Sequence, residues 1–520
     1  MSRHYPDRVE VKLDYAIGTK RRHTHYRIET YFFVPRTLGL DVHTYSRDEF
    51  FTDNHASIRF KEPRIPSSVL ANPRDPESPL CKACEMIRQA NGRLETLSPH
   101  KLSYEMRLFG CIVRTHLRDV AIDMHDKIER LKSGGARSVL AQDVRQGLVH
   151  LLQEVDAQLQ ALRGTRAAFF QPKRPPWLSE LFEYVDEYIG LSAESCLTSV
   201  LIHLDGHPAL RTTQGDLREQ IVARIVTEQR HRQSAGYAQS LVDPEGENRS
   251  RVYRASALKK FMSSVLYLDI RKEKDGRGIT NVMAGLAAAV AMAFSTVAAI
   301  WSQGTYGLNS FPFVIAVVIG YVFKDRIKEW LRTYFSGLVS RRLYDYSMHI
   351  QDPNTKTVLG RCRESFVFVP LTQVPVDIIR YRHCDSKSAL EPETKPEVVM
   401  KYVKDVTLWG RRIAKLRPNL TDIRDINRLN VSRLLIRMNE PRQVVATYSP
   451  DRDEVVGVSC PKTYHVNLVV VRTADEQPMT VARYRVLIDK RGVRSMQPVE
   501  PSLSVEPSLS VNSSLSRSRH

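Results

Sequence analysis

Two cysteines in the sequence Cys81-Lys-Ala-Cys84 have the spacing at which a pair of thiolates can share a tetrahedral zinc ion. Such a site needs a second pair of ligands, and the spacings of His100, Cys111 and His116 match no standard zinc finger or ribbon. No strand precedes the pair, as a thioredoxin-like redox motif would require. Zinc is therefore the alternative, and two incidental thiols are the main interpretation.

His203 and His207 lie four residues apart, so on one helix their imidazoles would face the same way and could hold a metal. Gly206 and Pro208 instead favour a turn, in which His and Asp side chains cap backbone groups. A zinc-protease signature needs a glutamate after the first histidine, and a leucine stands there. We therefore expect no metal and no cofactor. If the chain is an enzyme, His203, Asp205 and His207 are the first residues to test.

Motifs that cradle phosphates or dinucleotides, and the Gly-x-Ser-x-Gly elbow of hydrolases, are absent from the sequence. Basic clusters at 20–23 and at Arg411-Arg412 could contact anionic lipid or phosphate, although solvated charge is the simpler interpretation. The chemistry-bearing residues therefore favour a protein that binds partners over one that catalyses a reaction.

The chain of 520 residues carries a net charge of +19, which suits either nucleic acid or an anionic lipid surface. Because no RNA-binding pattern of interleaved glycines and aromatics is present, we expect lipid headgroups rather than nucleic acid as partners. The length predicts roughly two or three separately cored units. Seven scattered cysteines indicate a reducing compartment, and the N-terminal residues lack the apolar run of a signal peptide.

Two long runs of the sequence, residues 279–301 and 305–323, carry no charged side chain. At about 1.5 Å per residue, helices of these lengths reach about 35 Å and about 28 Å, against a hydrocarbon core of about 30 Å. Pro312 near the start of the second run could shorten or kink it. The runs predict a two-helix transmembrane hairpin, and the alternative is a buried helical hairpin in a soluble protein.

Basic residues flank the two runs, whereas the connector Ser302 to Ser310 carries no charge. By the positive-inside rule, both flanks and both termini are expected in the cytoplasm, at a bacterial inner membrane. The residues expected to contact anionic headgroups are Arg271, Lys272, Lys274, Arg277, Lys324, Arg326, Lys328, Trp330 and Arg332.

Small residues recur at four-residue spacing as Gly285, Ala289 and Ala293 in the first run and as Ala316 and Gly320 in the second. Such stripes allow helix backbones to approach closely in lipid. They predict either packing of the hairpin against itself or self-association into a homo-oligomer. No ionisable residue lies inside either run, which argues against a carrier.

Before the membrane runs, alternating apolar residues over 9–17 and 26–34 predict two strands that pair as a β-hairpin within a module at 1–61. Five prolines between Glu62 and Pro79 predict that this stretch lacks regular structure, as a linker or an extended wrap, and the proline-rich linker is assigned to 62–98. Apolar residues three and four apart predict a helical domain over 99–270, whose last helix continues into the membrane.

After the membrane runs, the apolar face of Ile327, Leu331 and Phe335 predicts an amphipathic helix over 324–348, which lies on the membrane or packs on a partner. An α+β domain is expected over 360–495, and its strands could share a sheet with the N-terminal strands or pack face to face with them. Ser- and Pro-rich repeats predict a disordered tail over 496–520. The elements expected in the α+β domain are a helix at 398–416 and strands at 365–369, 444–448, 455–459, 464–472 and 479–488.

The expected fold is an α+β integral membrane protein with a cytoplasmic helical bundle, an N-terminal β-hairpin, a two-helix transmembrane hairpin and a C-terminal antiparallel β-rich module. The large share of soluble residues favours a non-enzymatic scaffold or regulator that binds protein partners at the inner membrane face. One alternative is a membrane-surface enzyme. The other is a subunit of an oligomeric pore lined by Thr280, Asn281, Ser295 and Thr296.

Overall fold

The computed structural model of the chain has mixed α+β structure and divides into two compact units. The sheet unit consists of Met1–Ile58, Leu268–Pro418 and Ile423–His520, and the helical unit of Arg59–Tyr267 and Asn419–Asp422. The helical unit is therefore an insertion in the chain of the sheet unit. The residues that the structure describes are 2–18, 21–90, 97–132, 137–171, 174–206, 210, 214–237, 248–274, 277–306, 310–340, 344–384, 396–417, 420, 422–440, 442–451, 453–475 and 477–499.

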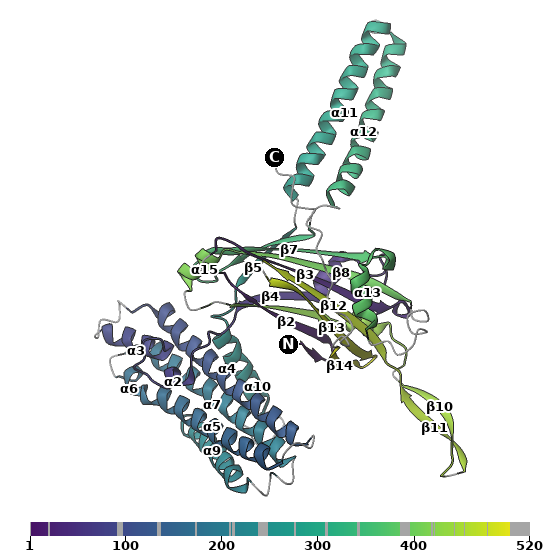
Figure 1. The fold of residues 1–520 in the computed structure, drawn as a ribbon. Helices are drawn as coiled ribbons and strands as arrows, with labels where there is room; N and C mark the ends of the chain where they lie inside the picture. Colours follow the sequence, from purple (N-terminus) through teal and green to yellow (C-terminus); the bar gives the residue numbers. More distant parts are fainter. Residues whose placement is uncertain are drawn as a thin grey trace. The chain divides into compact units, whose positions relative to one another are not determined.

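The helical unit is a bundle in which long helices lie side by side (Figure 1). Its helices are α2 (Ser67–Leu70), α3 (Pro79–Gln89), α4 (Pro99–Lys132), α5 (Arg137–Gly164), α6 (Arg166–Phe169), α7 (Pro176–Asp205), α9 (Gly215–Ser234) and α10 (Asn248–Ser263). The stretch Glu62 to Pro79 was predicted to lack regular structure, and α2 is the exception within it. The linker assigned to 62–98 also contains α3. Pro66 precedes the first turn of α2 and Pro79 is the first residue of α3, positions where proline costs no hydrogen bond.

The sheet unit contains an eight-stranded antiparallel sheet with the order β14-β13-β12-β3-β8-β7-β6-β5. Its strands are β3 (Thr24–Pro35), β5 (Asp269–Lys274), β6 (Tyr346–Gln351), β7 (Val358–Val369), β8 (Glu397–Leu408), β12 (Tyr464–Ala474), β13 (Gln477–Asp489) and β14 (Gly492–Val499). A second sheet has the order β1-β2-β9-β4. Its strands are β1 (Ser2–Tyr5), β2 (Arg8–Ala16), β4 (Asn54–Phe60) and β9 (Asp422–Asn430).

Short helices connect these strands, and a third sheet of two strands, β10 (Arg442–Ser449) and β11 (Glu454–Pro461), completes the unit. The short helices are η1 (Arg36–Leu38), α1 (Arg47–Asp53), η3 (Leu371–Gln373), α13 (Val376–His383), α15 (Gly410–Leu416) and α16 (Ser432–Ile436). The predicted strands of the C-terminal region are confirmed, including the hairpin of β10 and β11.

The pairing predicted for the N-terminal strands is wrong. β2 belongs to the four-stranded sheet, whereas β3 pairs with β12 and β8 in the middle of the eight-stranded sheet. Phe32 and Val34 therefore pack with the four-stranded sheet and α1, and Tyr31 and Phe33 pack on the opposite face beneath α13. Both arrangements considered for the N- and C-terminal strands are found. β3 shares the eight-stranded sheet with the C-terminal strands, whereas β2 belongs to the four-stranded sheet and packs face to face with β12 through Val9 and Val11.

Two further boundaries differ from the prediction. Residues 397–408 form strand β8 rather than a helix, and only 410–416 are helical. β8 is buried on both faces, so its apolar residues do not alternate, and their spacing resembles that of a helix. The repeat region is predicted to be disordered from residue 496, yet β14 extends to Val499, and 500–520 lie outside the described residues.

The apolar segment forms two antiparallel helices, α11 (Arg277–Tyr306) and α12 (Phe311–Ser340), which lie side by side (Figure 1). We call this pair the helical hairpin. The helical bundle does not continue into it, because α10 ends at Ser263 and strand β5 intervenes. β5 pairs antiparallel with β6, with Lys274 opposite Tyr346. The chain therefore leaves and re-enters the eight-stranded sheet at adjacent positions, and the helical hairpin is the connection between two paired strands.

Candidate functional site

The helical hairpin exposes large apolar side chains along both of its helices. In α11, residues Asn281–Thr305 have a mean hydropathy of 2.0 and are long and apolar enough to cross a membrane, and only 11% of that segment is buried. Length and composition of this kind also occur in core helices of soluble proteins, but those are mostly buried. Trp301 is 68% exposed and Phe311 is 78% exposed. An apolar surface of this extent requires a cover of protein or lipid.

The second helix is less apolar than predicted. Residues 305 and 306 belong to the end of α11, so the uncharged part of α12 covers only Phe311–Phe323, about 20 Å of helix. Lys324 follows directly, and its ammonium lies 3.6 Å from the centre of the Tyr321 ring. Among the described helices, α11 alone meets the length and composition of a membrane span. The second transmembrane span is therefore not confirmed.

The contact between the two helices uses small residues, although not the predicted stripe of α11. Ala287, Ala291 and Ser302 are the buried residues of α11, whereas Gly285, Ala289 and Ala293 are exposed on its outer surface. On α12, Gly320 is buried, and a Cβ added there would lie 3.7 Å from the Cβ of Ala298; Ala316 is half-buried. The spacing of small residues was visible in the sequence, but a helix rich in alanine has several such stripes.

The amphipathic helix predicted over 324–348 is the continuation of α12, and it ends at Ser340 before strand β6. Its apolar residues Ile327, Leu331 and Phe335 are half-buried. α11 lies alongside α12 (Figure 1), so this segment is part of the helical hairpin, and its contact with a membrane surface or a partner stays a prediction. The helical hairpin thus extends beyond the apolar part of α12.

The predicted lipid-contacting residues are divided between strand β5 and helix α12. On β5, Arg271 and Lys272 are both exposed, and the Lys272 ammonium lies 4.0 Å from the centre of the Tyr346 ring and 4.7 Å from that of Phe51. Desolvation there lowers the pKa of Lys272. The side chains of Lys274 and Arg277 lie outside the described residues. On α12 the exposed members are Arg326, Lys328, Trp330 and Arg332, while Lys324 is half-buried.

The candidate zinc ligands Cys81 and Cys84 are free thiols on helix α3. Burial raises the pKa of Cys84 to about 11. His203 is on α7, where its ring stacks on that of His125 with 3.9 Å between centroids. His207 lies outside the described residues. Within the described part of the chain, no group of three His, Cys, Asp or Glu residues could hold a metal ion.

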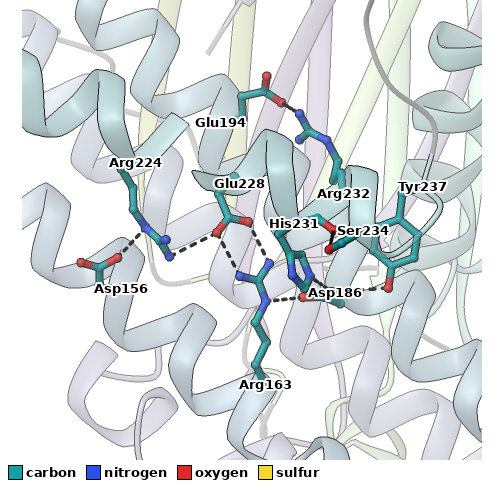
Figure 2. Close-up of polar contacts among 10 residues, drawn as sticks. All are labelled: Asp156, Arg163, Asp186, Glu194, Arg224, Glu228, His231, Arg232, Ser234 and Tyr237. Carbon is teal, nitrogen blue, oxygen red and sulfur yellow. Dashed lines mark hydrogen bonds and ion pairs between the residues drawn. The ribbon is translucent and has the colours of Figure 1, made fainter. Parts of the chain in front are cut away.

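A network of buried charges, which we call the Arg163 network, connects α5, α7 and α9 in the helical unit (Figure 2). The guanidinium of Arg163 donates from Nε to Asp186 at 2.8 Å, and its two terminal nitrogens donate to Glu228 at 2.9 and 2.8 Å. His231 lies 2.8 Å from the other oxygen of Asp186. Arg224 joins Glu228 to Asp156, with distances of 3.2 and 2.5 Å.

The two carboxylates at the centre of this network are shielded from solvent, with Asp186 3% and Glu228 0% exposed. Burial opposes the charge of Arg163, but the bonds to Glu228 and Asp186 outweigh it and raise the pKa of Arg163. A Cβ on Gly190 of α7 would lie 3.3 Å from Glu228, so the glycine makes room for the network. The guanidinium of Arg163 thus neutralises these carboxylates and ties α5 to α7 and α9. We therefore interpret the network as structural.

The sequence contained a signal for this network that was not used. Asp186 lies between Val185 and Ile189 on the apolar stripe of α7, where an acidic residue is expected only with a buried partner. The partner itself is not visible in the sequence, because any of many arginines could supply it.

Replacing Arg163 with methionine should destabilise the helical unit by about 3–5 kcal/mol, because two buried carboxylates lose the guanidinium that they share. Arg145→Met is the matched control, since Arg145 and Asp216 form an exposed pair whose loss should cost less than about 1 kcal/mol. Urea unfolding measures both, followed by the fluorescence of Trp177, the one tryptophan of the helical unit, in a chain with Trp301, Trp330 and Trp409 replaced by phenylalanine. Equal midpoints for the two variants would contradict the role given to the network.

A second buried charge centre lies in the sheet unit, where Lys404 of β8 is 0% exposed. Its ammonium is 2.8 Å from Asp425 of β9 and 3.8 Å from Glu364 of β7, and Glu364 also accepts a hydrogen bond of 2.7 Å from Tyr402. Burial opposes the charge of Lys404, but the neighbouring carboxylates outweigh it and raise its pKa. Burial also raises the pKa of Glu364. The centre joins the two large sheets.

A surface groove of about 560 Å³ lies in the helical unit. Its charged lining consists of Lys61, Glu62, Arg64, Glu77, Lys82 and Asp422. Cations and carboxylates are equal in number, so the groove selects neither for an anion nor for a cation.

Asp205, a residue considered for catalysis, is bound by Arg218 at 2.7 and 3.1 Å.

Comparisons of the chain with protein-family models, with curated proteins and with solved structures found no match.

Proposed function

We propose that this chain is a membrane-anchored scaffold or regulatory protein, in which the helical hairpin inserts into the bilayer and the two soluble units bind protein partners. The observation that carries the proposal is the exposure of α11: only 11% of its apolar segment Asn281–Thr305 is buried. Lipid can cover such a surface without burying an unpaired backbone N–H or C=O group, because both helices satisfy their backbone hydrogen bonds internally.

The strand pairing at the base of the helical hairpin supports a single-sided topology. Lys274 and Tyr346 are opposite each other in β5 and β6, so the chain enters and leaves the hairpin from the same place. The basic residues of α12 at 324, 326, 328 and 332 favour the cytoplasmic side of a bacterial inner membrane, where anionic headgroups attract them. The short apolar part of α12 reaches across the hydrocarbon core only if these long side chains extend toward the headgroups.

The strand pairing also provides the experiment. Residues 275–345 can be replaced by Asn-Gly, because this two-residue turn closes an antiparallel pair such as Lys274 and Tyr346. We expect the complete chain to remain with membranes after washing at alkaline pH, and the shortened chain to be soluble and folded. A shortened chain that stays with the membranes, or a complete chain that the wash releases, would refute the anchor.

The exposed stripe of Gly285, Ala289 and Ala293 favours self-association of the anchor as part of this function. Since this stripe does not pack on α12, it is available to a second α11 in lipid. Gly285→Leu with Ala289→Leu should therefore weaken association of the chain in nanodiscs or detergent by about tenfold, measured by energy transfer between labelled chains. Ala284→Leu, at a half-buried position off this stripe, is the control for added bulk. Unchanged association in the double variant would exclude this contact.

A further inference from the structure

The strands β10 and β11 form an isolated two-stranded sheet, which we call the arm (Figure 1). They pair in an unbroken register from Arg442 opposite Pro461 to Ser449 opposite Glu454. Among the strands that the structure describes, neither pairs with any other, so the outer edge of each carries unpaired backbone groups. Two strands alone are marginally stable in water.

The arm is apolar on both faces. Val444 and Tyr448 of β10 lie on one face with Val455, and they are 69%, 56% and 72% exposed. Val445 and Val458 are directly opposite each other on the other face, and they are 45% and 43% exposed. The strands contain no charged residue between their ends, so they lack the lysines that usually protect an exposed edge. The surface is therefore that of an interface.

Charge is confined to the two ends of the arm and differs in sign between them. The tip carries Asp451, Asp453 and Glu454, with Arg452 as a partial offset, whereas the base carries Arg442 and Lys462. An antiparallel neighbour of the same sequence would place its acidic tip beside this basic base. The charges thus favour a second copy of the chain as the occupant.

We propose that the arm pairs edge to edge with the arm of a second copy, with strand β10 antiparallel to its counterpart and Ala446 at the two-fold axis. In this register Val444 lies opposite Tyr448 of the second copy, an aromatic and β-branched pair of the kind that stabilises sheets. Arg442 lies next to Asp451 of the second copy. The two arms together form a four-stranded sheet, and no like charges are opposed.

Disulfide crosslinking of the complete chain in nanodiscs tests this register. In a Cys460→Ser background, Ala446→Cys should form a disulfide-linked dimer, since directly opposed residues have Cα atoms about 4.5–5.5 Å apart. Ser449→Cys is the matched control, because the two copies of that residue would be displaced by six positions, about 20 Å. A mixture of Gln443→Cys and Ser449→Cys chains should crosslink, because these two residues are opposed.

Charge reversal provides a second readout that does not depend on cysteine. Arg442→Glu should lower the yield of the Ala446→Cys dimer several-fold, and adding Asp451→Arg should restore it. Equal crosslinking at positions 446 and 449 would overturn the proposal. So would an uncrosslinked Ala446→Cys chain: one that still reacts with a water-soluble maleimide has an uncovered arm, and an unreactive one has an arm covered by lipid.

Discussion

Replacing Lys404 with methionine should destabilise the sheet unit by about 3–5 kcal/mol, one of the largest effects expected of any single substitution in this chain. Lys404 is fully buried and is the cation that faces Asp425 and Glu364. Without it, two buried carboxylates lose the ammonium that lies closest to both of them. Urea unfolding of the complete chain with Trp177, Trp301 and Trp330 replaced by phenylalanine, followed by the fluorescence of Trp409, reports on this unit.

Lys401→Met is the control for this prediction, because Lys401 is on the same strand and pairs with Glu29 at 2.9 Å while partly exposed to solvent. Its loss should cost about 1 kcal/mol or less. Combining Lys404→Met with Asp425→Leu should recover much of the stability, since it removes one of the uncompensated carboxylates. A Lys404→Met chain as stable as the Lys401→Met chain would contradict the role of the buried centre.

The pH dependence of the Lys404→Met chain gives a further check. Burial raises the pKa of Glu364 and of Asp425. Between the ordinary carboxyl pKa and these raised values, the folded chain therefore binds more protons than the unfolded chain. Stability therefore decreases as the pH rises from about 4 through the raised pKa values. The deficit of the variant relative to wild type should be smaller at pH 5 than at pH 8.

Two lysines placed in the middle of α11 should remove the chain from the membrane. Val290 and Phe294 are 44% and 43% exposed on the hairpin surface, and each lysine at the centre of a bilayer costs roughly 2.5–3.5 kcal/mol. The change Val290→Lys with Phe294→Lys should shift most of the protein from the alkali-resistant membrane fraction to soluble or aggregated material. Membrane fractionation with quantitative blotting measures this.

The matched control is Asn281→Lys, at an exposed position near the start of the same helix. A lysine there can extend its ammonium to the headgroups, so this variant should remain in the membrane fraction. If the double lysine variant also remained there, α11 would not lie in hydrocarbon, and the exposed apolar surface would need a protein cover instead.

Local patterns in the sequence predicted most strands of the C-terminal region but not their partners. β3 and β12 are far apart in the chain, yet they pair from Phe33 opposite Asn467 to Tyr26 opposite Ala474. Nothing in the alternation of either strand specifies the other, so pairing with the nearest predicted strand was the natural but wrong choice. β8 was misassigned because a strand covered on both faces loses the alternation that distinguishes it from a helix.

The candidate anchor was predictable because its signal, the lack of charge over a long run, is local. Which face of α11 meets α12 was not, because alanines occur on all sides of that helix and the choice depends on where the connector turns. Buried charges such as Lys404 and Arg163 were missed for a related reason. A single lysine among valines indicates burial only when the strand is known to lie between two layers.

The most direct test of the single-sided anchor is trypsin digestion of sealed membrane vesicles of both orientations. The connector 302–310 contains no Lys or Arg, so a chain with both soluble units in the cytoplasm offers trypsin no site from outside. We predict an intact chain in right-side-out vesicles and digestion of both soluble units in inside-out vesicles. Cleavage of either unit in right-side-out vesicles would contradict the account.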